Sequence, residues 1–163
     1  MSVDASAAPR VRRWLVALAL LSLFGVADSG YLLWSHRHLA ADAAGSDGSA
    51  FCPAKGCEVV NQGEYAEVRG VPLAAIGLAG YLTILALSLL ATTLGSAHIL
   101  RAIVVLSGIG VCVSAYLIYL QLAVIKVICS YCVVSAITMM SILVVTLTLL
   151  WKIRPLDQPE RPA

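Results

Sequence analysis

Four long apolar runs limit what this chain can fold into. They cover about residues 14–34, 72–94, 99–124 and 132–151. Because an α-helix rises about 1.5 Å per residue, a run of about 21 residues spans about 31 Å, which matches the hydrocarbon core of a bilayer. Each run can therefore cross a membrane as one helix, and we predict an all-α membrane protein built as a four-transmembrane-helix bundle.

The composition agrees with this prediction. Hydrophobic residues make up 60% of the 163 residues and charged residues only 12%, which is outside the usual range for a soluble domain. We expect one membrane domain over 1–163, with disordered tails at 1–8 and 155–163. The basic residues lie in short groups beside the apolar runs and form no stripe along which phosphates could bind, so no nucleic-acid partner is expected.

A signal peptide is the alternative interpretation of the first run, because Arg10, Arg12 and Arg13 precede it. The run is longer than the 7 to 15 apolar residues typical of signal peptides, and no clear cleavage site follows. We therefore expect this segment to remain as the first membrane span.

The connections between the runs predict the topology. A short link at Gly95 to His98 makes the second and third helices an antiparallel hairpin, so the long loop at about 36–70 and the link at 126–131 lie on one face of the bundle. Near the span ends, seven basic residues lie on the side of the termini and four on the side of the loops. Because basic residues are more frequent on the cytoplasmic side, this favours cytoplasmic termini. The seven are Arg10, Arg12, Arg13, Arg101, Lys152, Arg154 and Arg161, and the four are Arg37, Lys55, Arg69 and Lys126. Both loops are thus expected to be extracytoplasmic.

Two cysteine pairs fall on this extracytoplasmic side. Cys129 and Cys132 are separated by two residues where the fourth helix begins, and the N–H groups and macrodipole of a helix N-terminus favour a thiolate. Cys52 and Cys57 lie in the long loop, with Pro53 and Gly56 suited to a turn between them. The Gly- and Ser-containing stretch at 43–50 is expected to let the loop pair move. A movable pair beside a pair fixed at a helix start indicates relayed thiol–disulfide exchange.

Two other uses of these cysteines remain open. Four thiolates could bind zinc, which would make the chain a metal-binding or metal-transport protein. Alternatively, both pairs could be inert disulfides of an assembly subunit. The fifth cysteine, Cys112, falls in the middle of the third run, and we expect it to pack in the core.

The order of several motifs resembles the vitamin K epoxide reductase family, and specifically its bacterial homologues. The similarity runs from about Gly25 to Ser135. The motifs are Asp28-Ser29-Gly30-Tyr31-Leu32, the pair Cys52/Cys57, Tyr65-Ala66, Gly70-Val71-Pro72-Leu73, Gly77, Tyr81 and Cys129-Ser130-Tyr131-Cys132. The resemblance implies a four-helix bundle that surrounds a quinone in the bacterial inner membrane. It also implies that the protein reoxidises a thioredoxin-like, DsbA-type partner.

The resemblance also implies roles for the cysteines. Cys132 resembles the cysteine that faces and reduces the quinone, with Cys129 as its exchange partner. Cys57 resembles the loop cysteine that forms a disulfide with Cys129, and Cys52 the one attacked by the partner. The acceptor would be ubiquinone or menaquinone, and vitamin K epoxide is not expected as the natural substrate.

Some features depart from the family pattern. Gly63 stands where many relatives have Ser or Thr, and only about a dozen residues follow Trp151, so we expect the partner to be a separate protein. The DsbB family performs the same task, but its two cysteine motifs occur in the reverse order.

The quinone pocket itself is less clearly marked in the sequence. Asp28 is the only acidic residue within a predicted span, and ionisable groups inside a membrane are candidates for function. A helix-capping or interhelical hydrogen bond is the alternative role for Asp28. Tyr116 and Tyr119 in the third run could border a quinone, although tyrosines near an interface also serve as membrane anchors.

Overall fold

A computed structural model gives the architecture of the chain. It describes residues 8–42, 67–68, 70–94, 96–126 and 128–153. Four long helices dominate: α1 (Ala8–Asp42), α3 (Leu73–Leu94), α4 (Ala97–Leu120) and α5 (Ser130–Ile153). All four are long and apolar enough to span a membrane, which confirms the predicted membrane protein.

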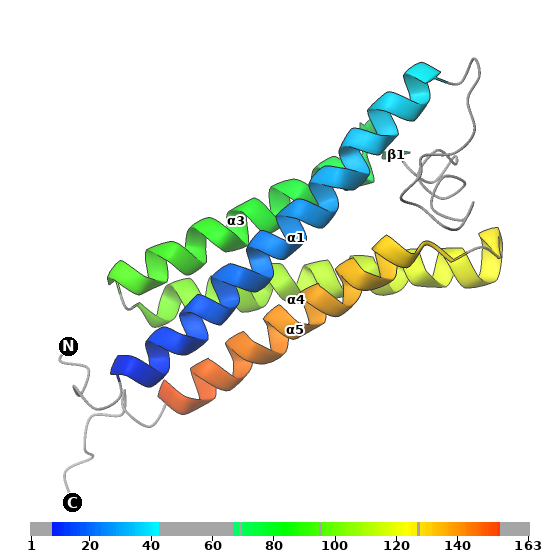
Figure 1. The fold of residues 1–163 in the computed structure, drawn as a ribbon. Coiled ribbons are helices and arrows are strands. Elements are labelled where there is room, and N and C mark those ends of the chain that lie inside the picture. Colours follow the sequence, from blue (N-terminus) through cyan, green and yellow to red (C-terminus); the bar gives the residue numbers. More distant parts are fainter. Residues whose placement is uncertain (1–7, 43–66, 69, 95, 127, 154–163) are drawn as a thin grey trace, which may run out of the picture.

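The helices form a closed ring of four. α1 packs against α3 and α5, and α4 packs against the same two helices, so α1 faces α4 across the bundle and α3 faces α5. The start of α1 and the end of α5 lie at the same end of the bundle (Figure 1). The start of α5 lies at the opposite end, where α3 begins and α4 finishes.

Several predicted boundaries shift. The first helix begins at Ala8 and continues to Asp42, seven residues into the predicted loop, because Leu39, Ala40 and Ala41 are strong helix formers that can extend a helix beyond the membrane. The rest of that loop, 43–66, lies outside the described residues, and so do 1–7 and 154–163 of the predicted tails.

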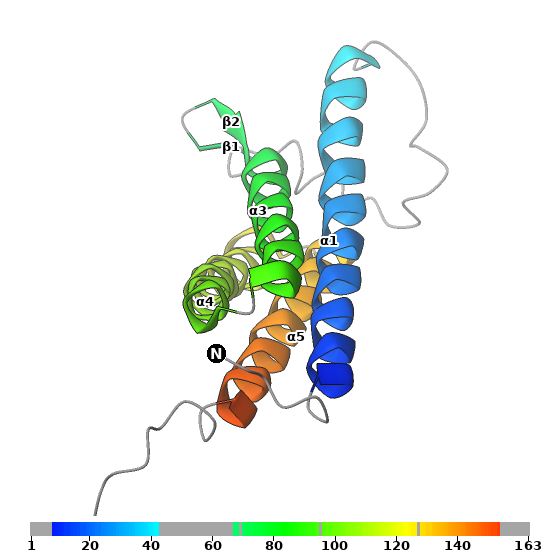
Figure 2. The same ribbon diagram turned by 90° about the vertical axis from the view of Figure 1, so that its left-hand side faces the viewer.

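Two features were not predicted. A small antiparallel hairpin, β1 (Glu67–Val68) and β2 (Val71–Pro72), leads into α3 and turns at Gly70, whose φ of +79° suits glycine (Figure 2). After α4, the chain continues as a π-helical turn, η1 (Gln121–Ile125), which ends at Lys126 in a left-handed conformation. Such π-helical turns are often found at functional sites.

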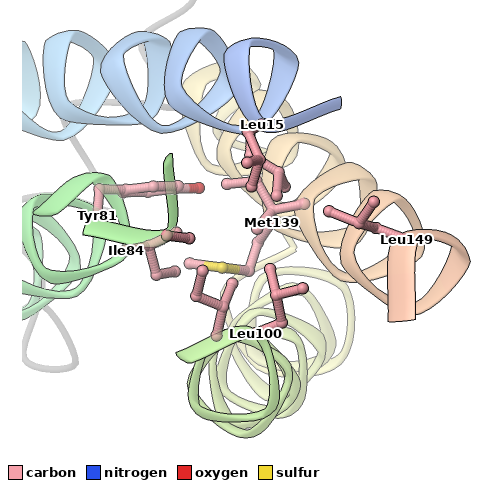
Figure 3. Close-up of a cluster of buried hydrophobic side chains, with 10 residues drawn as sticks. Leu15, Tyr81, Ile84, Leu100, Met139 and Leu149 are labelled. Atoms are coloured by element: carbon pink, nitrogen blue, oxygen red, sulfur yellow. The ribbon is translucent and has the colours of Figure 1, made fainter. Parts of the chain in front are cut away.

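Apolar side chains fill the bundle and also cover its outside. Leu15, Ile84, Leu100, Met139 and Leu149 meet in the core, with the Met139 sulfur between Ile84 and Leu100 (Figure 3). Large apolar side chains on the outer face of all four helices are exposed, as a lipid environment requires. They include Leu20, Leu89, Val105 and Val144.

The position of Cys112 differs from the predicted one. Cys112 does not pack in the core, because its side chain is exposed on the outer face of α4. Helical rotation decides which side of a span faces inward, and the nearly uniform apolar character of this span left that rotation undetermined.

Candidate functional site

The site is built around the start of α5. Cys129 is completely buried and occupies the position just before the helix, since its carbonyl accepts the N–H of Val133 at 3.2 Å. The N–H of Cys132 donates to the Cys129 sulfur at 3.4 Å, as an N-cap side chain would accept it. The half-buried Cys132 lies on the first turn of the helix. The predicted pair therefore lies at a helix N-terminus, where N–H groups favour a negative sulfur.

A side chain from η1, the turn that continues α4, holds Cys129 in place. The Gln121 Oε1 accepts a hydrogen bond from the Cys129 backbone N–H at 2.9 Å. Gln121 is almost completely buried, and its Nε2 has no hydrogen-bond partner within the described residues. The π-helical turn begins at Gln121, so the local backbone irregularity coincides with the residue that contacts the cysteine motif.

Aromatic packing joins the cysteine motif to α1. The ring of Tyr131, between the two cysteines, lies 5.1 Å from the ring of Tyr31, and Tyr31 lies 6.3 Å from Trp34. Both ring pairs are tilted, a favourable arrangement at these centroid distances. The start of α5 is thus fixed against α1 by aromatic contacts and against α4 by Gln121.

Farther into the bundle, three helices meet through a polar cluster. The Tyr81 hydroxyl donates to the Ser135 carbonyl at 2.8 Å and lies 3.0 Å from the Ser135 Oγ. The Ser135 side chain is also a hydrogen-bond partner of the Asp28 carboxyl. We call these three residues the polar triad. Tyr81 comes from α3 and Ser135 from α5, so the contact crosses the diagonal of the ring.

A glycine makes room for this cluster. A Cβ atom at Gly25 would overlap the Tyr81 ring, so the ring packs directly on the backbone of α1. Figure 3 shows the Tyr81 side chain extending from α3 into the middle of the bundle, alongside α1. Gly25 therefore permits the approach that brings the Tyr81 hydroxyl to Ser135.

The structure brings only some of the predicted site residues together. Cys129 and Cys132 lie at the start of α5. Asp28, on α1, reaches the next turn of α5 through its hydrogen bond to Ser135. Tyr116 and Tyr119 are 59% and 62% exposed on α4, so both lie on the outer surface of the bundle. Their role toward a quinone stays a prediction. Cys52, Cys57 and Gly63 lie outside the described residues.

Sequence reasoning did not assign a role to Ser135 or to Gly25. Ser135 follows Cys132 by three residues, so it lies on the neighbouring helical turn, and this spacing was the available signal. Gly25 could not be distinguished from the other glycines of the spans, because its importance depends on which helix face meets Tyr81.

The model of the vitamin K epoxide reductase family matches residues 16–147. The matched region includes all three members of the polar triad, Gln121 and the Cys129/Cys132 pair, and it covers most of each of the four membrane-spanning helices. Members of this family are membrane oxidoreductases that work on thiols and disulfides. This chain belongs to the vitamin K epoxide reductase family.

Proposed function

We propose that the chain is a quinone-dependent thiol oxidase that regenerates a disulfide in a thioredoxin-like, DsbA-type partner. The observation that carries the proposal is the cysteine pair at the start of α5, with the Cys132 N–H donating to the Cys129 sulfur. A thiolate is the reactive species in disulfide exchange, and this position favours one. The pair also lies at one end of a bundle whose outer face is apolar, which would place it between water and the membrane.

In the proposed reaction, electrons move from the partner to the Cys52/Cys57 pair, then to the Cys129/Cys132 pair and finally to the quinone. Each exchange step transfers a disulfide in the opposite direction without net oxidation. In the last step, two thiols form one disulfide and lose two electrons and two protons, and the quinone takes up both to become a quinol. Ubiquinone or menaquinone would serve as the acceptor.

The lipid side of the bundle would deliver the quinone. Tyr116 and Tyr119 are exposed on the end of α4 that leads to Gln121, so a quinone that diffuses in the membrane could meet them before it reaches Cys132. We place the termini in the cytoplasm of a bacterial inner membrane and the cysteine loops outside, where thiols meet an oxidising compartment.

The test is quinone reduction by the purified protein in detergent, with two alternative electron donors. A reduced DsbA-type protein should support the wild type but neither Cys52→Ala nor Cys132→Ala. A small dithiol that can reach the helix pair directly should restore turnover in Cys52→Ala and not in Cys132→Ala. This pattern would establish the order of the relay.

Other outcomes would contradict the proposal. A folded wild type that reduces neither ubiquinone nor menaquinone with either donor would remove the oxidase function. Stoichiometric zinc in that inactive protein would instead favour the four-thiolate metal site.

A further inference from the structure

Asp28 carries a buried carboxyl oxygen with no assigned role. The residue is 8% exposed, and its Oδ2 has no hydrogen-bond partner within the described residues. A buried polar atom without a partner loses its hydration and gains nothing in return. Inside a membrane span such a group points to a function rather than to stability.

The remaining contacts of Asp28 connect it to α5. Its carboxyl is a hydrogen-bond partner of Ser135, whose Oγ lies 3.0 Å from the Tyr81 hydroxyl. Tyr81 donates its own proton to the Ser135 carbonyl, which leaves the Ser135 hydroxyl proton available for Asp28. The polar triad is thus a short chain of hydrogen bonds that ends at the Asp28 carboxyl, the group that carries the unpartnered oxygen.

The triad lies close to the cysteine that the quinone is expected to meet. Ser135 follows Cys132 by three residues, one turn along α5, or about 4.5 Å along the helix axis. Side chains at this spacing are neighbours on a helix surface. A proton that leaves the Cys132 thiol therefore has an acceptor chain on the adjacent turn.

The proposed reaction needs such an acceptor. Oxidation of the Cys129/Cys132 pair breaks two S–H bonds, forms one S–S bond and releases two electrons and two protons. The quinone takes up both electrons and both protons as two O–H bonds form. Protons are conserved overall. If one proton passes directly from a thiol to the nearer quinone oxygen, a local group that holds the other until the second O–H bond forms is sufficient.

We propose that Asp28 is this proton carrier: it takes a proton released from the Cys129/Cys132 pair and returns it to a quinone oxygen through the Ser135 hydroxyl. Of the three side chains in the triad, the Asp28 carboxyl changes its protonation state most readily, because phenol and aliphatic hydroxyl groups hold their protons much more tightly. Tyr81 acts as a positioning residue that holds Ser135. This inference rests on the proposed oxidase function.

A single-turnover experiment tests the inference. The purified protein is fully reduced, freed of reductant and mixed with a short-chain ubiquinone, and loss of quinone absorbance is followed. Asp28→Asn, which keeps the shape but cannot carry the proton, should slow quinone reduction about a hundredfold, as expected for loss of a general acid–base group. Its thiol–disulfide exchange with a small dithiol should stay at the wild-type rate.

Two further variants and one control separate a proton role from a structural one. Ser135→Ala should slow the same step, and both slow variants should show a larger solvent deuterium isotope effect than the wild type, because proton transfer has become limiting. Ser88→Ala is the matched control, since its buried hydroxyl donates to the Ile84 carbonyl of its own helix. This control should react like the wild type.

Each contrary outcome has a distinct meaning. Wild-type rates in Asp28→Asn, with impairment only in Asp28→Leu, would show that the carboxyl is a structural hydrogen-bond partner and would overturn the inference alone. A wild type that does not reduce quinone would remove the oxidase function and the inference together.

Discussion

The two ends of the bundle satisfy their buried polar groups in different ways. At the apolar end (residues 11–22, 84–107 and 138–153), the buried hydroxyls donate to carbonyls of their own helices. They are Ser22, Ser88, Ser107, Thr138 and Thr146. At the thiol end (residues 25–35, 73–81, 116–126 and 128–135), polar bonds also join different elements, as between Tyr81 and Ser135 and between Gln121 and Cys129.

The unpartnered atoms follow the same division. Within the described residues, the two buried side-chain atoms without a hydrogen-bond partner are Asp28 Oδ2 and Gln121 Nε2, and both lie at the thiol end. A hydroxyl that bonds its own helix leaves the packing surface apolar, whereas a bond between helices fixes their relative rotation. In the proposed function, the apolar end serves stability and the thiol end serves chemistry, at some cost in unsatisfied polar groups.

The largest expected contrast comes from the cysteines. Cys129→Ser should abolish quinone reduction, because a hydroxyl at this position cannot form the disulfide. Cys112→Ser, on the exposed face of α4, should leave the rate unchanged. Steady-state quinone absorbance measures both, and loss of activity in the Cys112 variant would contradict the assignment of the chemistry to the cysteines of the thiol end.

The next contrast concerns a glycine at the junction of the two ends. Gly25→Ala places a Cβ against the Tyr81 ring, and such overpacking costs about 1 to 3 kcal/mol of unfolding free energy. Gly80→Ala is the matched control, since nothing lies within 4 Å of its added Cβ and alanine favours a helix. Thermal unfolding in detergent should show a lower Tm for the first variant only. Equal Tm values would mean that α1 and α3 are farther apart than described.

Gln121 allows a direct comparison of the two kinds of polar bond. Gln121→Leu leaves the buried Cys129 N–H without its acceptor, which should cost about 1 to 3 kcal/mol. Thr146→Val removes a hydroxyl that bonds its own helix and should cost less, about 0.6 kcal/mol. Chemical unfolding in mixed micelles gives both free energies, and the reverse order would break the proposed distinction.

The smallest effect is expected at the far end of the bundle. The Lys152 Nζ lies 5.0 Å from the centre of the Trp14 ring, a cation–π contact between α5 and α1. Lys152→Met should remove about 0.5 to 1 kcal/mol, as for exposed contacts of this kind, and leave quinone reduction untouched. A change in rate would link the apolar end to the chemistry.

The sequence predicted the spans well because hydropathy depends only on composition along the chain. It also singled out Asp28 as a candidate, since an acid inside an apolar run is conspicuous. It correctly placed the Cys129/Cys132 pair at a helix start. The rotation of each helix about its own axis could not be predicted from the sequence. The diagonal contact of Tyr81 with Ser135 and the outward position of Cys112 both depend on it.

Local irregularities were equally hard to foresee. The run that ends near Val124 looks like one helix in the sequence, whereas the structure has a π-helical turn from Gln121 that directs this side chain to Cys129. Such a turn adds one residue to a helical ring and leaves the hydropathy unchanged.

The central claim is that the cysteine pair at the start of α5 passes its electrons to a quinone. The most direct measurement uses a triple variant, Cys52→Ala, Cys57→Ala and Cys112→Ser, in which Cys129 and Cys132 are the remaining cysteines. After full reduction it is mixed with ubiquinone, and the quinol and the disulfide are quantified together. The account predicts one quinol for each Cys129–Cys132 disulfide in a single turnover. A folded variant that keeps both thiols and consumes no quinone would contradict it.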